Sequence, residues 1–465
     1  MKEKIKTHFK IHGEKYLDIL FFVLVFGVLL LWSMMLRMND GPDETGRYSI
    51  CQYIFRHGSL PHGGDEEIRI PEWGFSYAFQ PILPFIIGAG FMKITALFTA
   101  NEYFYIVAAR FVSVLCGLLM AVFVRKISKL IFEDKKCQWI FTLLVCLLPQ
   151  GMFMCVYVNT DSMALLSSAV ILYAWLRGME SGWSYKDCLI LSVGIILCAL
   201  SYYNAYGFIL CSIFVFAASF IRKDEGNHRF RIEWKELLKK GGLISGIVLI
   251  GIGWWFIRNY VIYDGDFLGL ATRKAYGELY AEYEWLKPSN ARTYANAGLS
   301  VFRMLKDTEY IPLVAKSFVG VFGRMDMMLS NRIYRGFSII FLCGAGIFLP
   351  KVKHGCMLRY SDDRKKVFGV NMVICIIIPI LLCTYYSYAV DFEPQGRYIL
   401  PMLIPFMFVI TKGISKIFGI IKNGKVCGLI TALICGFTIL SVCDFMKNVV
   451  AAEYGEAFIR FFQAL

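Results

Sequence analysis

Runs of about 20 apolar residues recur along the whole chain, and they constrain its fold more than any other feature. A helix needs about 20 apolar residues to cross the roughly 30 Å hydrocarbon core of a bilayer. Inside lipid, every backbone polar group must find a partner within the chain, which leaves only helices and closed barrels. Barrel strands would show apolar alternation over about ten residues, and the sequence has none. The chain is therefore predicted to be an all-α polytopic membrane protein.

The composition supports this prediction, because 57% of the 465 residues are apolar and only 18% are charged. A soluble domain carries about 25% charged residues. The first run, 17–38, is too long for the core of a signal peptide and lacks a small-residue cleavage site, so we expect an uncleaved first span. Eleven runs qualify as spans, at residues 17–38, 103–124, 137–158, 162–176, 188–205, 207–221, 242–261, 336–349, 367–388, 399–411 and 426–446.

The basic residues predict the topology. Segment 81–100 is apolar enough to span, but Pro81, Pro84 and Lys93 weaken it. If this segment stays on one side, six clusters holding 29 of the 49 Lys and Arg residues also fall on one side, as the positive-inside rule requires. These clusters are the N-terminus, 125–136, 177–186, 222–240, 351–366 and 412–425. We therefore expect segment 81–100 to lie in, or re-enter from, the outer interface.

This topology gives a multi-pass protein of the cell (plasma) membrane, with a cytoplasmic N-terminus and an extracytoplasmic C-terminus. Residues 1–465 form one predicted transmembrane domain without a separate soluble domain. Its outer face carries a first loop at 39–102 and a second at 264–335, beside the amphipathic tail 451–465. In the second loop, 311–329 is predicted to be another interfacial helix. The net charge of +14 reflects the inner clusters, so we expect no nucleic-acid partner.

Cysteine and histidine usage gives no sign of a metal centre. Most of the 15 cysteines lie inside apolar runs, and neither a CxxC pair nor zinc-type spacing occurs. Free buried thiols are expected instead. Asp264-Gly265-Asp266 has the form of a metal-binding DxD but is interpreted as a turn, and His57 and His62 as loop residues. No cofactor is predicted, and a divalent metal has no support in the sequence.

Carboxylates stand at the outer ends of the spans rather than inside them, where Arg110 is the clearest charge. Ion-coupled transporters usually need buried carboxylates as relays. Asp43 and Glu44 follow the first span directly, so the depth of Asp43 is fixed where it could act as general base toward a hydroxyl. Asp161 is a second such acid. The alternative for both aspartates is a helix N-cap or turn, and the two interpretations are compatible.

Three arginines also lie at the outer ends of spans or in outer loops. Arg258 is followed by Asn259 at the end of a span, Arg397 precedes another span, and Arg324 lies in the second outer loop. A planar guanidinium at headgroup depth suits a phosphate group. The alternative is that these side chains snorkel to lipid headgroups.

Several motifs follow one another in an order that resembles the GT-C superfamily of membrane glycosyltransferases, across about residues 15–445. The resemblance is greatest to the protein mannosyltransferase and aminoarabinose transferase branch (glycosyltransferase families 39 and 83). The motifs are Pro42-Asp43-Glu44-Thr45, Arg47-Tyr48-Ser49-Ile50, Gly58-Ser59-Leu60-Pro61-His62, Phe79-Gln80-Pro81-Ile82-Leu83-Pro84, Ala109-Arg110-Phe111-Val112-Ser113, Asn159-Thr160-Asp161, Trp255-Phe256-Ile257-Arg258-Asn259-Tyr260, Tyr263-Asp264-Gly265-Asp266 and Gln395-Gly396-Arg397-Tyr398-Ile399-Leu400-Pro401. An interfacial helix between the first two spans is a further trait of that superfamily.

The resemblance implies an inverting transfer of a sugar from a polyprenyl-phosphate donor to a glycan, lipid or protein acceptor on the outer face. It makes Asp43 the catalytic carboxylate, with Asp161 beside it, and implies phosphate binding by Arg258 and Arg397. The other residues that it implies for the substrate site are Glu44, Tyr48, Gln80, Asn259, Arg324, Gln395 and Tyr398. One departure is Gln80, which stands where the aminoarabinose branch has Lys. The corresponding phosphate contact then falls to Arg324 or another arginine.

Two other functions compete with a transferase. A carrier or flippase for a lipid-linked sugar or polymer should show inverted repeats and a mid-membrane site, and the sequence has neither. A non-catalytic subunit of an envelope-assembly complex would keep the same pattern without the activity. The membrane lipids themselves are partners in every case.

Overall fold

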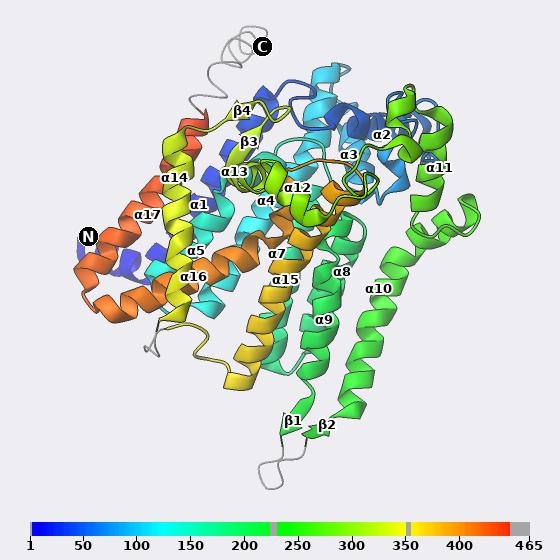
Figure 1. Ribbon diagram of the computed structural model, residues 1–465. Helices are drawn as coiled ribbons and strands as arrows, with labels where there is room; N and C mark the ends of the chain where they lie inside the picture. Colours follow the sequence, from blue (N-terminus) through cyan, green and yellow to red (C-terminus); the bar gives the residue numbers. More distant parts are fainter. Residues whose placement is uncertain (1, 224–229, 350–354, 447–465) are drawn as a thin grey trace.

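Helices make up most of the described chain, which comprises residues 2–223, 230–349 and 355–446 of a computed structural model (Figure 1). Two short antiparallel hairpins interrupt them. The first pairs β1 (Ile221–Lys223) with β2 (Phe230–Ile232), and the second pairs β3 (Val321–Phe322) with β4 (Met327–Met328). The predicted all-α class is confirmed. The tail 451–465, predicted to be an amphipathic helix, lies outside the described residues.

Seven segments of the described chain are long and apolar enough to cross a membrane. They lie in α1 (Lys2–Met35), α4 (Glu102–Ile131), α7 (Asp161–Ser181), α10 (Trp234–Ile262), α15 (Asp362–Ala389), η6 (Gly396–Met402) with α16 (Leu403–Ile421), and α17 (Gly424–Phe445). The other four predicted spans fall on shorter pieces, which are α5 (Lys135–Cys146) with α6 (Pro149–Met154), α8 (Tyr185–Ala199), η2 (Tyr203–Ala205) with α9 (Gly207–Ala218), and α14 (Asn331–Leu342) with η5 (Cys343–Phe348). Eleven spans therefore remain a prediction.

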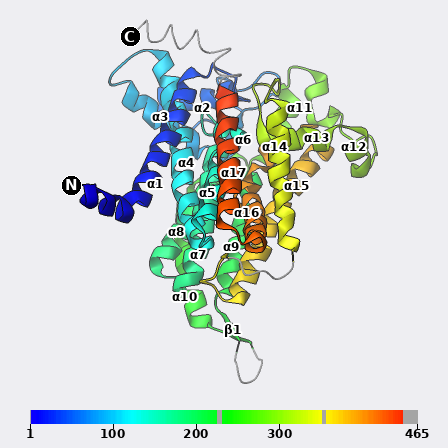
Figure 2. The same cartoon turned by 90° about the vertical axis from the view of Figure 1, so that its left-hand side faces the viewer.

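One predicted inner segment, the β1–β2 hairpin, lies at the opposite end of the bundle from the predicted outer loops. In Figures 1 and 2 the β1–β2 hairpin projects from the lower end, while α2 (Glu44–His57), α3 (Leu83–Thr95) and α11 (Leu270–Tyr280) lie at the upper end. Hydrogen bonds join segments that carry basic clusters. The Glu133 N–H, in cluster 125–136, donates to Gly355 O, in cluster 351–366, at 2.9 Å. Lys240 Nζ, in cluster 222–240, donates to Gly182 O, in cluster 177–186, at 2.9 Å. Four of the six basic segments that the charge pattern grouped are therefore joined in two pairs.

The first outer loop starts and finishes at the same end of the bundle. Tyr103, in the first turn of α4, donates its hydroxyl to Met34 O near the end of α1 at 2.7 Å. Between them, η1 (Tyr77–Phe79) precedes α3, whose 13 residues are too few to cross a bilayer. Segment 81–100 therefore does not span the bundle, as the basic residues predicted.

The second outer loop differs from its prediction. It contains α11, α12 (Val301–Asp307), α13 (Tyr310–Gly320) and two single turns, η3 (Glu284–Leu286) and η4 (Pro288–Asn290). The single helix expected over 311–329 is wrong in its second half, because α13 ends at Gly320 and the β3–β4 hairpin follows. Gly323 has a φ of 62°, a left-handed conformation that favours glycine and turns the chain.

A fully buried ion pair joins the first outer loop to the bundle. The Arg110 guanidinium, from α4, contacts both carboxylate oxygens of Glu44 at 2.7 Å. Its remaining N–H groups donate to the carbonyls of Ser33, Leu36 and Arg37 where α1 ends. Glu44 Oε1 also accepts from the backbone N–H of Val158 at 3.0 Å. The pair therefore fixes the end of α1, the start of α2 and the link before α7 together.

We expect Glu44→Gln to lower the free energy of unfolding by about 3–5 kcal/mol, because Arg110 would keep a buried charge without its counter-ion. The fall in the thermal unfolding midpoint of the purified protein measures this effect. Glu66→Gln is the control, since Glu66 meets Arg69 on the surface at 3.8 Å and should cost at most about 1 kcal/mol. Equal shifts for both variants would contradict a central role of the buried pair.

Candidate functional site

Asp43 lies where the chain turns from α1 into α2, and its backbone is strained. Its φ of 62° is left-handed, which is uncommon for a residue with a side chain. The Tyr157 ring packs closely against this turn, because a Cβ atom at Gly41 would lie 2.4 Å from it. Strain of this kind collects at functional sites. The Asp43 carboxylate is 34% exposed and is the accessible acid of the cluster described next.

Arg397, on η6, contacts this carboxylate from a part of the chain more than 350 residues away. Its NH2 group lies 3.1 Å from Asp43 Oδ2. The Nε and NH1 groups are buried and find no acceptor among the described residues. Buried N–H groups are nearly always hydrogen-bonded, so these two donor groups are open to an anionic ligand or to water.

Gly396 helps to fix the position of its neighbour Arg397, because it lets η6 pack closely against α13. A Cβ atom at this position would lie 2.1 Å from the backbone nitrogen of Phe318, in α13. The Gly396 N–H donates to Ser317 Oγ at 2.6 Å. Only glycine allows the two backbones to approach so closely, and the contact fixes η6 against the second outer loop.

Arg47 lies between the two predicted acids. Its NH2 group is 3.5 Å from Asp43 Oδ2, and its NH1 group is 3.9 Å from Asp161 Oδ2. Its guanidinium lies over the Tyr77 ring, with 5.1 Å from Cζ to the ring centroid. Asp161 is the first residue of α7 and is buried. The fold thus brings Asp43, Asp161 and Arg397 together, and Arg47 joins them.

Tyr398 and Glu393 extend the cluster. The Tyr398 hydroxyl accepts from Arg397 NH2 at 3.0 Å and donates to the Glu393 carboxylate. Gln395, predicted for the substrate site, has a buried side-chain oxygen with no donor among the described residues. We call Asp43, Arg47, Asp161, Arg397 and Tyr398 the Asp43 cluster.

The charges around Asp43 hold it ionised. Burial alone would raise the pKa of its carboxyl group. The nearby Arg47 and Arg397, with hydrogen bonds from Arg397 and Tyr77, outweigh burial and bring that pKa below the ordinary value. Asp43 is therefore a carboxylate at neutral pH.

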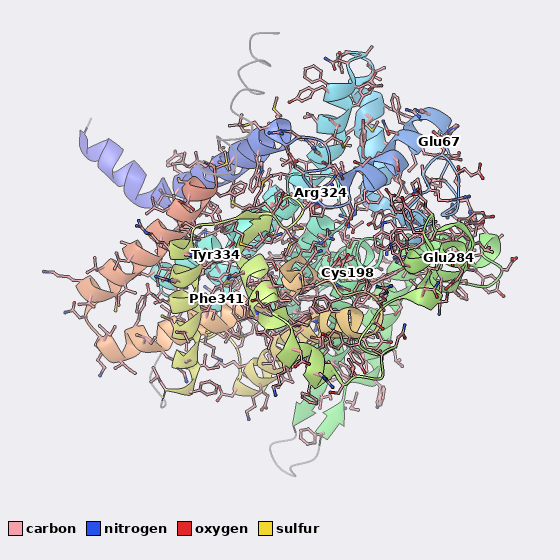
Figure 3. All side chains as sticks on the ribbon, turned by 45° about the horizontal axis from the view of Figure 1, so that its top comes forward. Glu67, Cys198, Glu284, Arg324, Tyr334 and Phe341 are labelled. Carbon is pink, nitrogen blue, oxygen red and sulfur yellow. The ribbon has the colours of Figure 1, made fainter. Side chains whose placement is uncertain are left out.

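Other predicted residues lie apart from this cluster. Arg258 donates to Pro61 O at 2.6 Å, and Asn259 is buried with its amide donating to Phe267 O at 3.3 Å. Arg324 is exposed on the turn between β3 and β4, where Figure 3 labels it. Gln80 is half-buried directly after η1. None of these four side chains makes a hydrogen bond or an ion pair with the Asp43 cluster among the described residues.

Two further predicted residues, Glu44 and Tyr48, lie on α2 but face away from Asp43. The Glu44 carboxylate is fully occupied by Arg110 and the Val158 N–H, so it positions the helix instead of meeting a ligand. Tyr48 lines a separate groove on the opposite side of the helix.

Arg273, on α11, is a cation near the cluster that the sequence did not single out. Its guanidinium lies 4.3 Å from the centroid of Phe75 and makes no ion pair within the described chain. Its charge opposes the rise that burial causes in the pKa of Tyr77, the same residue over which Arg47 stacks. The sequence does not distinguish Arg273 from its neighbour Lys274, because only the packing of α11 shows which of the two side chains faces inward.

The described residues offer no group of three His, Cys, Asp or Glu side chains that could hold a metal ion. Asp266 instead accepts from the backbone and hydroxyl of Thr272, at 2.8 and 3.0 Å, and so holds the first turn of α11. The interpretation of Asp264-Gly265-Asp266 as a turn is confirmed. All fifteen cysteines are free thiols.

Residues 71–406 match the model of a family described as predicted membrane protein, DUF2142. The chain belongs to the DUF2142 family. This match covers most of the sequence and includes Asp161, Arg273 and Arg397, whereas Asp43 and Arg47 precede it. No curated protein matches the sequence.

Two solved structures share the fold of this DUF2142 protein. ArnT from Cupriavidus metallidurans, bound to undecaprenyl phosphate, is similar with a TM-score of 0.53 and 16% identity, over 95% of this chain and 66% of ArnT. The oligosaccharyltransferase AglB from Archaeoglobus fulgidus gives 0.50 and 13%, over 90% of this chain and 55% of AglB. Both are GT-C glycosyltransferases, so the predicted GT-C-type bundle is confirmed. The chain spans less than two thirds of either protein.

The lowered pKa of Asp43 gives its contribution to stability a definite pH dependence. The contribution is complete above the unfolded-state pKa of about 3.9 and is lost as the pH falls through the lower folded-state pKa. We expect the difference in thermal midpoint between wild type and Asp43→Asn to stay constant from pH 8 to pH 6 and to shrink below about pH 4. A difference that changes between pH 8 and pH 6 would contradict the lowered pKa.

Proposed function

We propose that this protein transfers a sugar from a polyprenyl-phosphate donor to a glycan, lipid or protein acceptor on the outer face of the plasma membrane. The observation that carries the proposal is the Asp43–Arg397 contact at 3.1 Å, at the end of the bundle that holds both predicted outer loops. It places an ionised carboxylate next to a buried cation with two unused donors. A transfer with an anionic leaving group needs both.

The unused donors of Arg397 favour a phosphate. Each buried N–H group without an acceptor costs about 1–3 kcal/mol, a cost that a phosphate oxygen would remove. Guanidinium groups bind phosphates through paired hydrogen bonds. Arg273 would supply a second cation from the second outer loop, since the neutral side chain of Gln80 cannot provide one. Arg258 and Arg324 then need no direct part in donor binding.

The chemistry follows from these two groups. An acceptor hydroxyl or amide attacks the anomeric carbon, a new glycosidic bond forms with inversion, and the bond from that carbon to the phosphate oxygen breaks. Asp43 takes the proton of the acceptor, and Arg397 stabilises the charge on the departing polyprenyl phosphate. Asp161 keeps Arg47 in place. A phosphate on Arg397 also weakens its hold on Asp43, which raises the basicity of the carboxylate when the donor is bound.

The lipids bound in the two similar structures agree with a polyprenyl-phosphate donor. ArnT was solved with undecaprenyl phosphate and AglB with dolichol-phosphate. A polyprenyl donor also fits a seven-span or larger bundle, because the chain of the lipid stays in the bilayer while its phosphate reaches the outer end. No step of the proposed reaction uses a metal ion or a nucleic acid.

Asp43→Asn tests the reaction. We expect transfer from radiolabelled polyprenyl-phosphate sugars to crude envelope acceptor to fall by about 10²–10⁴-fold, the range for loss of a general base. Glu72→Gln, which removes an exposed carboxylate of the same loop, should leave transfer unchanged. Equal transfer by wild type and Asp43→Asn would remove Asp43 from the mechanism. No transfer by wild type with any donor would favour a carrier or an assembly subunit.

Arg273→Gln tests the second cation. We expect the KM for the donor to rise about tenfold or more, the loss of one charge-assisted hydrogen bond, with a smaller change in kcat. Lys274→Gln is a matched control, because it removes the same charge from the exposed side of α11. If both variants raise the KM equally, the effect comes from the loss of one positive charge on α11, and Arg273 does not bind the donor phosphate directly.

A further inference from the structure

The hydrogen of the Tyr398 hydroxyl has a fixed place, because the hydroxyl lies between a guanidinium and a carboxylate. Arg397 NH2 donates to the hydroxyl oxygen at 3.0 Å, and the hydroxyl donates to Glu393 Oε2. A hydroxyl has one hydrogen and two lone pairs, while an ionised carboxylate only accepts hydrogen bonds. Glu393 therefore takes that hydrogen, and a lone pair of the hydroxyl oxygen is left to face Arg397.

The same contact occupies one nitrogen of Arg397 completely. The NH2 group has two hydrogens, and it donates to Tyr398 at 3.0 Å and to Asp43 Oδ2 at 3.1 Å. The Nε and NH1 groups have no acceptor among the described residues. Within the described chain, hydrogen bonds therefore hold the guanidinium through NH2 alone, and its orientation depends on both of these partners.

Without the Glu393 carboxylate, the Tyr398 hydroxyl would be free to rotate. A hydroxyl hydrogen turned toward Arg397 would face an N–H group, and two donors cannot form a hydrogen bond. The bond from NH2 to Tyr398 would then be lost, and the guanidinium would keep only Asp43 as its partner. No ion pair joins Glu393 to Arg397 directly among the described residues, so Glu393 acts on Arg397 through the hydroxyl.

The loop that carries Glu393 is held by its backbone. Ser387 Oγ donates to the Glu393 carbonyl at 3.1 Å, and the Gln395 N–H donates to the same oxygen at 2.8 Å. The Glu393 N–H donates to Asp391 O at 2.9 Å. A substitution of the Glu393 side chain leaves these bonds in place, so its effect on Arg397 can be measured in a folded protein.

The charge of Glu393, unlike its hydrogen bond, works against an anion on Arg397. A carboxylate repels a nearby phosphate, so electrostatics alone predicts tighter phosphate binding once the carboxylate is removed. Asp391 offers a comparison in the same loop, where burial and then the Glu393 charge raise the pKa of its carboxyl group. Its side chain makes no ion pair with the Asp43 cluster among the described residues. Substitutions at Asp391 and Glu393 therefore separate charge from orientation.

We propose that Glu393 is a positioning residue for the donor phosphate. It fixes the hydrogen of the Tyr398 hydroxyl, and thereby the orientation in which Arg397 presents Nε and NH1 to the phosphate. This role rests on the proposed function, because it takes the phosphate of a polyprenyl-phosphate donor as the ligand of Arg397. Glu393 itself acts only through Tyr398.

Binding of undecaprenyl phosphate to the purified full-length protein in lipid nanodiscs tests this role. We expect the Kd to rise about tenfold in Glu393→Gln, as for the loss of one hydrogen bond at a charged group. Asp391→Asn removes a carboxylate two residues away and should leave the Kd unchanged or lower it. Equal changes of the Kd in both variants would overturn the proposal, because the effect would then be one of charge.

A double-mutant cycle with Tyr398→Phe shows whether Glu393 acts through the hydroxyl. Tyr398→Phe alone should also raise the Kd about tenfold, and the double variant should bind no more weakly than Tyr398→Phe. Additive effects would overturn the proposal, since Glu393 would then act without the hydroxyl. If Glu393→Gln does not fold, Glu393→Asp, which moves the carboxylate back by one methylene, takes its place in the cycle.

The role of Glu393 and the proposed function can fail separately in these experiments. Sugar transfer by the wild type together with additive effects on the Kd would keep the transferase and reject Glu393 as a positioning residue. Binding of undecaprenyl phosphate with a non-additive cycle, but without any sugar transfer, would keep the phosphate site and reject the transferase. A wild type that does not bind undecaprenyl phosphate would reject both.

Discussion

The buried pair between Glu44 and Arg110 is the interaction on which the outer end of this protein depends. Two charges are placed in the apolar bundle at 1% exposure or less, which is unfavourable unless every donor and acceptor is satisfied. Here all of them are, through the carbonyls at the end of α1 and the N–H of Val158. Such a pair allows one geometry only. The residue before Glu44 is Asp43, so the same geometry determines where the proposed reactive carboxylate lies.

The Asp43 cluster is assembled from segments that are remote in sequence but share one end of the bundle. Asp43 and Arg47 come from the first outer loop, Asp161 from the start of α7, and Arg397 from η6. Two carboxylates and two guanidinium groups alternate in space, so each acid has a basic neighbour. This balance keeps the cluster stable without a ligand. It still leaves Nε and NH1 of Arg397 without an acceptor among the described residues.

Much of this arrangement could be predicted from sequence because it follows from the bilayer. The lengths of the apolar runs identified the long helices. The basic clusters predicted which connecting segments lie on the same side, and hydrogen bonds from Glu133 and Lys240 join two pairs of these segments. The motif order also pointed to Asp43, Asp161 and Arg397. The sequence could not show that Arg47 bridges the acids or that Arg273 faces inward, because both depend on tertiary packing. It also assigned Arg324 to the site, whereas the β3–β4 turn leaves that residue exposed.

The contact of Gly396 with the backbone of Ser317 and Phe318 has a consequence for how such proteins can diverge. It couples Arg397 mechanically to the second outer loop, since η6 cannot shift without α13 shifting as well. Changes in the length or sequence of that loop can therefore move the Arg397 guanidinium, which we propose binds the donor phosphate, by fractions of an ångström. Substrate preference could then evolve through loop residues that never touch a substrate, while every residue of the Asp43 cluster stays the same.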